Sequence, residues 1–266
     1  MNDSHTDNTV GNGLESLSVL GSKVHIIENP GTVKVMDGWI QEEADRCHYI
    51  VNTGMHGIME AHRDPSFKTV LRSADLFCPD GILLVLTARV RGHSIKKSKT
   101  GPDLMSDFLN NTKDRGYKHY FFGDTDATLE AVGSTLREKI PGIQIVGAYS
   151  PPFRPLTPEE DQAIVDDINR AAPDILWVGL GSPKQERWMY DHRDHLNVTI
   201  MVGVGAAFKF VSGNVNRASP LVSNLGFEWL WRFVKEPKRI WRRVLVDAPQ
   251  FIFFEILEIS GLKKYQ

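Results

Sequence analysis

Short apolar runs alternate with segments of helical periodicity along most of the chain. The runs predict buried strands at residues 24–27, 49–52, 76–78, 120–122, 143–146, 175–178 and 199–202. Helical spacing of apolar residues predicts helices at 33–47, 58–62, 82–91, 103–114, 127–139, 158–171 and 184–195. Such alternation is typical of an α/β fold, here a mostly parallel, Rossmann-like sheet with helices on both faces.

The alternation stops near Pro220, and the chain becomes helical, aromatic and basic. We therefore predict three parts: a disordered lead (1–14), an α/β catalytic core (15–217) and a C-terminal helical appendage (218–266). The polar start, MNDSHTDNTVGN, has neither the basic residues nor the apolar run of a signal peptide. No run approaches about 18 uninterrupted apolar residues, so we expect no transmembrane helix.

Composition adds few constraints. The 266 residues are 41% hydrophobic and 24% charged, as in an ordinary globular protein, and the net charge of −2 gives no sign of nucleic-acid binding. Two cysteines cannot form a disulfide framework or a four-ligand zinc site, which favours the cytoplasm. The histidines form no metal-ligand pattern, and we predict no metal and no cofactor.

Glycine-containing turns follow several predicted strands, at 52–54, 79–81, 123–124, 179–181 and 203–205. The carboxyl ends of parallel strands form the ligand-binding edge of such sheets. Neither a G-x-G-x-x-G dinucleotide fingerprint nor a P-loop is present. Glycine lets the backbone approach a phosphate, so a nucleoside diphosphate suits this edge. Each turn taken singly is more often a plain strand-to-helix connection than a ligand site.

The Cys-Pro-Asp-Gly turn at 78–81 places one carboxylate at this edge. Pro79 fixes one backbone dihedral and Gly81 frees another, so Asp80 sits on a tight turn. A carboxylate there could act as a general base toward a hydroxyl, or it could simply cap the next helix.

The stretch GLGSPKQERW, at 179–188, predicts a strand end, a glycine turn and a helix that begins near Pro183. Lys184 could pair with a phosphate, and Gln185 could hydrogen-bond a sugar or base. The alternative is that Gln185 and Glu186 only favour the start of the helix.

Residues 225–243 interleave Trp and Phe with six Lys or Arg side chains. This composition suits the headgroup region of an anionic membrane, where each cation contributes about 1 kcal/mol. The basic groups could instead bind a pyrophosphate, or form a solvated face packed through its aromatics.

Five motifs together resemble the WecG/TagA/CpsF family of bacterial glycosyltransferases, from about Val19 to Phe251. They are P-D-G (79–81), T-G-x-D-L (100–104), G-x-G-x-P-K-Q-E (179–186), G-V-G…G…R-A (203–218) and L-G-x-E-W-L…R…P-x-R (225–239). The resemblance implies an inverting, metal-independent transfer of a sugar from a UDP-sugar to a polyprenyl-diphosphate-linked saccharide. It also implies cell-surface polysaccharide synthesis (exopolysaccharide, teichoic-acid linkage or common antigen), with the enzyme peripheral on the inner face of the cytoplasmic membrane.

The resemblance makes Asp80 the catalytic base. With the glycine turns, it gives the candidate nucleotide-sugar contacts Thr53, Gly123, Asp124, Tyr149, Gly179, Gly181, Lys184, Gln185, Gly203 and Gly205. The candidate contacts to the acceptor or diphosphate are Thr100, Arg217, Arg232 and Arg239. Apolar residues of the appendage could also pair subunits, so a homo-oligomer is possible.

The sequence departs from the family pattern in three places. The family usually has an asparagine shortly after the first core strand, in the form T-x-N or N-A-E, whereas this chain reads NTGMHG at 52–57. Lys209 stands where an aspartate is common, and Ser98 stands where a basic residue is common. The rival function is a non-catalytic nucleotide-sugar-binding scaffold of a polysaccharide assembly. An epimerase or dehydrogenase would need a dinucleotide fingerprint, which is not found.

Overall fold

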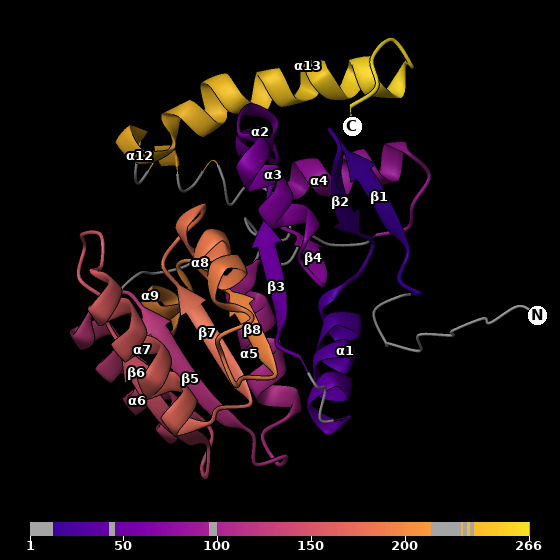
Figure 1. The fold of residues 1–266 in the computed structure, drawn as a ribbon. Coiled ribbons are helices and arrows are strands. Elements are labelled where there is room, and N and C mark those ends of the chain that lie inside the picture. Colours follow the sequence, from indigo (N-terminus) through magenta and orange to yellow (C-terminus); the bar gives the residue numbers. More distant parts are fainter. Residues whose placement is uncertain are drawn as a thin grey trace, which may run out of the picture.

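The computed structural model describes residues 13–42, 46–95, 100–213, 230, 233–234 and 237–265. A six-stranded parallel sheet forms its centre, in the order β4-β3-β8-β7-β5-β6 (Figure 1). The strands are β3 (His48–Thr53), β4 (Leu76–Pro79), β5 (Lys118–Gly123), β6 (Gln144–Tyr149), β7 (Ile175–Gly179) and β8 (Ile200–Gly203). The predicted parallel α/β architecture is therefore confirmed.

Helices cover both faces of the sheet, because successive strand residues point to opposite sides. Tyr49 and Val51 of β3 join one buried cluster and Ile50 joins the other. The first face carries α2 (Met55–Arg63), α3 (Pro65–Arg72), α7 (Pro158–Ala171) and α8 (Lys184–His192). The second carries α1 (Asn29–Gln41), α5 (Gly101–Asn111), α6 (Asp126–Lys139) and α9 (Ala207–Val211).

The first predicted strand belongs to a different sheet. β2 (Ser22–His25) pairs antiparallel with β1 (Ser16–Val19), and the two form a separate two-stranded sheet. Leu20 and Gly21 connect them with φ of 47° and 79°, the positive values that favour a tight hairpin turn. The placement of residues 24–27 as a strand of the main sheet was therefore wrong. Helix α3, which Asp64 caps, was not predicted.

The C-terminal segment packs on the core through its last helix. α12 (Pro237–Arg242) leads through η1 (Arg243–Asp247) into α13 (Ala248–Ile259), which lies across the top of the molecule in Figure 1. Arg91, at the end of α4 (Ile82–Val90), contacts Glu255 at 2.9 Å and Glu258 at 2.6 Å. These ion pairs fix α13 against the end of α4. Hydrogen bonds from the N–H of Leu20 to Glu258 and from Arg91 to the carbonyl of Ser18 add the N-terminal hairpin.

Some predictions lie outside the described residues. These are most of the lead (1–12) and the domain boundary at 217/218. Among the helices that the structure describes, none is long and apolar enough to cross a membrane.

Candidate active site

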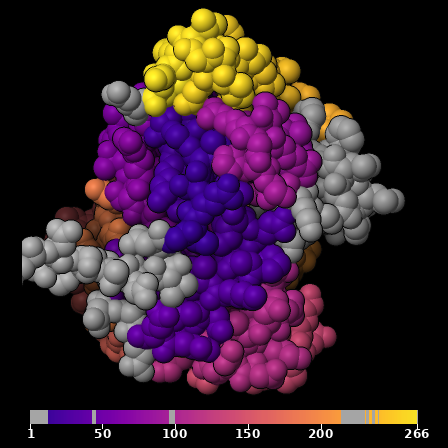
Figure 2. Space-filling view, turned by 90° about the vertical axis from the view of Figure 1, so that its right-hand side faces the viewer, coloured from indigo at the N-terminus to yellow at the C-terminus, as the bar shows by residue number. Residues whose placement is uncertain are grey.

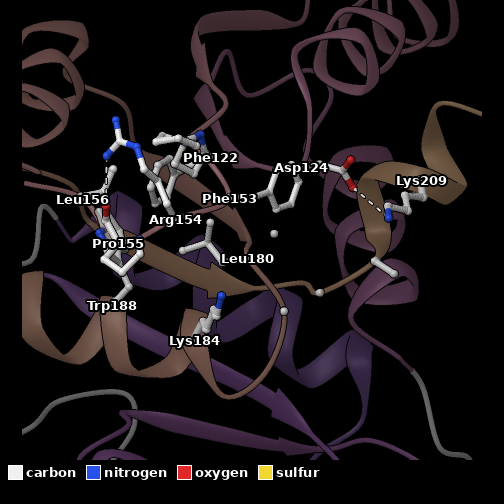
Figure 3. A pocket seen from close by; sticks show the side chains of 16 residues that line it. Phe122, Asp124, Phe153, Arg154, Pro155, Leu156, Leu180, Lys184, Trp188 and Lys209 are labelled. Carbon is white, nitrogen blue, oxygen red and sulfur yellow. Dashed lines mark hydrogen bonds and ion pairs between the residues drawn. The ribbon is translucent and has the colours of Figure 1, made fainter. Parts of the chain in front are cut away.

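A cleft of about 540 Å³ opens at the carboxyl ends of β5 and β7 (Figure 3). Its volume falls within the range of about 300–1,000 Å³ that small-molecule sites occupy. Its walls come from the ends of two strands, a proline-rich loop at 151–156, helix α8, and the segment that leads into and includes the first turn of α9. The lining residues are Phe122, Asp124, Pro151, Pro152, Phe153, Arg154, Pro155, Leu156, Gly179, Leu180, Gly181, Lys184, Trp188, Gly205, Ala206 and Lys209.

The cleft combines cations, aromatic rings and one carboxylate. Lys209 pairs with Asp124 at 4.0 Å at one end, and Arg154 lies at the other (Figure 3). Phe153, which is 87% exposed, and Leu180 lie between them. Lys184 adds a solvent-exposed ammonium at the start of α8. Positive charge beside flat apolar surfaces suits a ligand with an aromatic ring and an anionic group.

Two of the predicted glycines, Gly123 and Gly179, pack backbone against backbone at the carboxyl edge of the sheet. A Cβ on Gly123 would lie 2.6 Å from the carbonyl carbon of Gly179, and Gly123 has a φ of +127°. Only glycine tolerates both conditions. Gly203, also predicted as a contact, is buried because the side chains of Gln185 and Met189 cover it.

Gln185 lies behind the cleft lining and is 2% exposed. Its Oε1 accepts from the backbone N–H of Gly205 at 3.0 Å, and its Nε2 donates to Oε1 of Glu186 at 3.0 Å. Glu186 is fully buried, and desolvation raises the pKa of its carboxyl to about 7 despite the nearby Arg243. The amide therefore contacts a residue of the cleft lining from behind, whereas the sequence suggested a direct ligand contact.

Asp80 lies at the same carboxyl edge of the sheet and is partly exposed. Its backbone N–H donates to the carbonyl of Thr53 at 3.1 Å. Gly81, not Asp80, occupies the N-cap position of α4, so Asp80 is not an ordinary N-cap. Three strand steps of about 4.8 Å separate β4 from β7, so the ends of these two strands lie roughly 14 Å apart along this edge.

Two polar side chains beside Asp80 are buried at the end of β3. Thr53 is fully buried, with its hydroxyl 3.4 Å from Nε2 of His56, and it does not line the cleft. Asn52, which sequence analysis did not select, is 8% exposed, and neither atom of its amide has a hydrogen-bond partner within the described ranges.

The other predicted contacts are spread along the edge or fall outside it. Thr100 is the N-cap of α5 and forms a capping box with Asp103. The next residue, Gly101, packs against the backbone of Val204, directly after β8, so Thr100 also lies near the end of that strand. Tyr149 ends β6, half-buried, and does not line the cleft. Arg217 and Arg232 lie outside the described residues, as does the side chain of Arg239.

Sequence analysis missed the proline-rich loop at 151–156 and Trp188 as parts of the site. The signal for the loop was the PPFRPL stretch itself, directly after a strand end, and Trp188 ends the GLGSPKQERW stretch described above. Within the portion of the chain that the structure covers, no three His, Cys, Asp or Glu side chains are placed to hold a metal ion.

Comparisons with known proteins match this chain over most of its length. The family model described as "Glycosyl transferase WecG/TagA/CpsF family" matches residues 17–264. An N-acetylglucosaminyldiphosphoundecaprenol N-acetyl-beta-D-mannosaminyltransferase of Bacillus spizizenii (strain ATCC 23059 / NRRL B-14472 / W23) is 29% identical over 204 residues, 77% of each chain. A protein of the same name from Bacillus subtilis (strain 168) is 29% identical over 206 residues, again 77% of each chain.

Proposed function

The chain belongs to the WecG/TagA/CpsF glycosyltransferase family, and from this premise we propose that it transfers a sugar from a UDP-sugar to a polyprenyl-diphosphate-linked saccharide. The similar Bacillus proteins are named for transfer of N-acetylmannosamine to an N-acetylglucosaminyl diphosphoundecaprenol. An acceptor of that lipid-linked class is proposed for this chain, in the synthesis of a cell-surface polysaccharide.

The cleft is the proposed site of the nucleotide. Phe153 and the neighbouring prolines offer a flat apolar surface for a base. The side chain of Asp124 is 7% exposed, accepts from the N–H of Thr125 and pairs with Lys209, so it orients that lysine at the edge of the cleft. Lys184 and Lys209 supply positive charge for a diphosphate. The glycine turns allow the close backbone approach that a diphosphate needs.

Asp80 is the proposed general base. A donor whose base lies in the cleft extends its sugar along the strand ends toward β4. There the carboxylate of Asp80 takes the proton from the acceptor hydroxyl as its oxygen bonds to the anomeric carbon. The bond from that carbon to the diphosphate oxygen breaks, UDP leaves with the electron pair, and the anomeric configuration inverts. Cations near the diphosphate stabilise the developing negative charge.

The observation that carries this proposal is the shared edge. Asp80 is partly exposed, and the cleft opens at the carboxyl ends of strands in the same parallel sheet. A carboxylate buried in packing, or at the amino ends of the strands, could not meet a donor held in this cleft.

A membrane-facing surface is proposed on α13, consistent with a lipid-linked acceptor at the inner face of the cytoplasmic membrane. Ile252, Phe253 and Ile256 on this helix are each about half exposed, at 46–59%. Figure 2 shows α13, in yellow, capping one end of the molecule. Exposed apolar side chains in such a row favour an interfacial position. The same face could pair two copies of the chain in the absence of a membrane.

A transfer assay separates the enzyme from the rival, a nucleotide-sugar-binding scaffold. The purified full-length chain is incubated with radiolabelled UDP-sugars and a short polyprenyl-diphosphate N-acetylglucosamine. We expect label to appear in the lipid-linked product for one UDP-sugar. Saturable binding of UDP without transfer of any sugar would favour the scaffold.

A further inference from the structure

Glu186 lies one layer behind the cleft, on the first turn of α8. Its side chain is fully buried, and its neighbour Gln185 is almost so. Burying a carboxylate costs free energy that an apolar residue in the same place would not cost. A buried carboxylate at this position therefore calls for an explanation beyond packing.

The hydrogen bonds around Glu186 supply one. A glutamine amide can flip, exchanging its donor and acceptor, whereas an ionised carboxylate only accepts. Because Glu186 accepts from Nε2 of Gln185 at 3.0 Å, the amide oxygen of Gln185 must point the other way. That oxygen accepts from the N–H of Gly205 at 3.0 Å.

Gly205 is part of the cleft lining. The segment that leads to it is also packed on Gln185, since a Cβ on Gly203 would lie 2.8 Å from Nε2 of Gln185. The orientation of a single amide thus sets the position of this wall of the cleft.

We propose that Glu186 is a positioning residue, which fixes the amide of Gln185 and through it the Gly203–Gly205 wall of the nucleotide cleft. The consequence of this role for nucleotide binding rests on the proposed function, whereas the effect of Glu186 on the position of the wall does not. Glu186 does not line the cleft, and it acts on this wall through Gln185.

Glu186→Gln, studied at pH 9, is the main test. Glu186 is ionised there, since its pKa is about 7, and only accepts, whereas glutamine is nearly isosteric but can also donate. Gln185 then loses its fixed orientation, and its oxygen no longer faces Gly205 in every molecule. We expect the Gly205 amide to exchange with deuterium about tenfold faster, the equivalent of one hydrogen bond. We expect the Kd for UDP to rise by a similar factor, roughly tenfold. The melting temperature should not fall, since the variant removes a buried charge.

Glu130→Gln, an exposed position on α6, is the matched control and should change nothing. Unchanged exchange at Gly205 in Glu186→Gln would overturn the inference. So would a lower melting temperature with faster exchange throughout the sheet, which would mark a general structural role. If the wild-type chain does not bind UDP, the proposed function fails, while the exchange at Gly205 still decides the role of Glu186.

Discussion

Arg91 joins the C-terminal helix to the core, and its removal gives a prediction with a definite size. One nitrogen of its guanidinium contacts both Glu255 and Glu258, at 2.9 and 2.6 Å, and the other donates to the carbonyl of Ser18 at 2.7 Å. Glu255 is 4% exposed. Arg91→Met keeps most of the apolar stem but leaves two carboxylates without their cation. Breaking a buried pair in this way typically costs about 3–5 kcal/mol.

The loss should depend on pH. Burial raises the pKa of Glu255 to about 7 in the folded chain, above its ordinary 4.5, although Arg91 opposes this shift. Between these pH values the folded state binds more protons than the unfolded state, so the contribution of Glu255 to stability falls as pH rises. Without Arg91 its pKa rises further. The destabilisation by Arg91→Met should therefore be larger at pH 8 than at pH 5.

Thermal unfolding and deuterium exchange of α13 measure this effect. At pH 8 we expect a decrease of roughly 10 °C in melting temperature, or a selective loss of protection in α13 if that helix opens alone. Arg170→Met removes the matched but exposed pair with Asp167 and should cost less than about 0.5 kcal/mol. Equal losses at pH 5 and pH 8, or a loss at pH 8 no larger than that of Arg170→Met, would refute the reasoning.

Two further predictions concern the cleft and the surface of α13. Gly123→Ala forces a Cβ into the backbone of β7 at a residue whose φ is +127°. We therefore expect a lower melting temperature and, by calorimetry, loss of UDP binding. Wild-type values for both would contradict the packing of Gly123 on Gly179. Ile252→Glu/Ile256→Glu should reduce sedimentation with anionic vesicles, whereas Ser134→Glu/Ala163→Glu, on exposed positions of α6 and α7, should leave it unchanged. Equal sedimentation of both double variants would remove α13 from the membrane contact.

The sequence predicted the main sheet because each of its strands is a short buried run between helical segments. The same signal could not show to which sheet residues 24–27 belong, because a short apolar run looks the same in a parallel strand and in a hairpin strand. The hairpin depends on the pairing of β2 with β1, and β1 is a short strand of mixed burial, SLSV, with weak periodicity.

The parts of the site that depend on local backbone geometry could be predicted from the sequence, and the parts that depend on long-range contacts could not. The turn around Asp80 and the glycines at the carboxyl edge of the sheet follow from local requirements on φ and on space. Gln185 was expected to face a ligand because it follows a glycine turn. In the fold it is buried, and its oxygen accepts from the N–H of Gly205, which lies 20 residues further along the chain. Sequence spacing carries no information on that contact.

The most direct test of the account measures the turnover and the nucleotide affinity of Asp80→Asn together. Once a competent donor and acceptor pair is known, we expect kcat to fall by roughly 10²–10⁴-fold, the usual contribution of a positioned base, while the Kd for UDP stays within about twofold of wild type. Asp114→Asn, in an exposed turn, should behave as wild type. Turnover of Asp80→Asn equal to that of the control would contradict the central claim that this carboxylate and the cleft form one catalytic site.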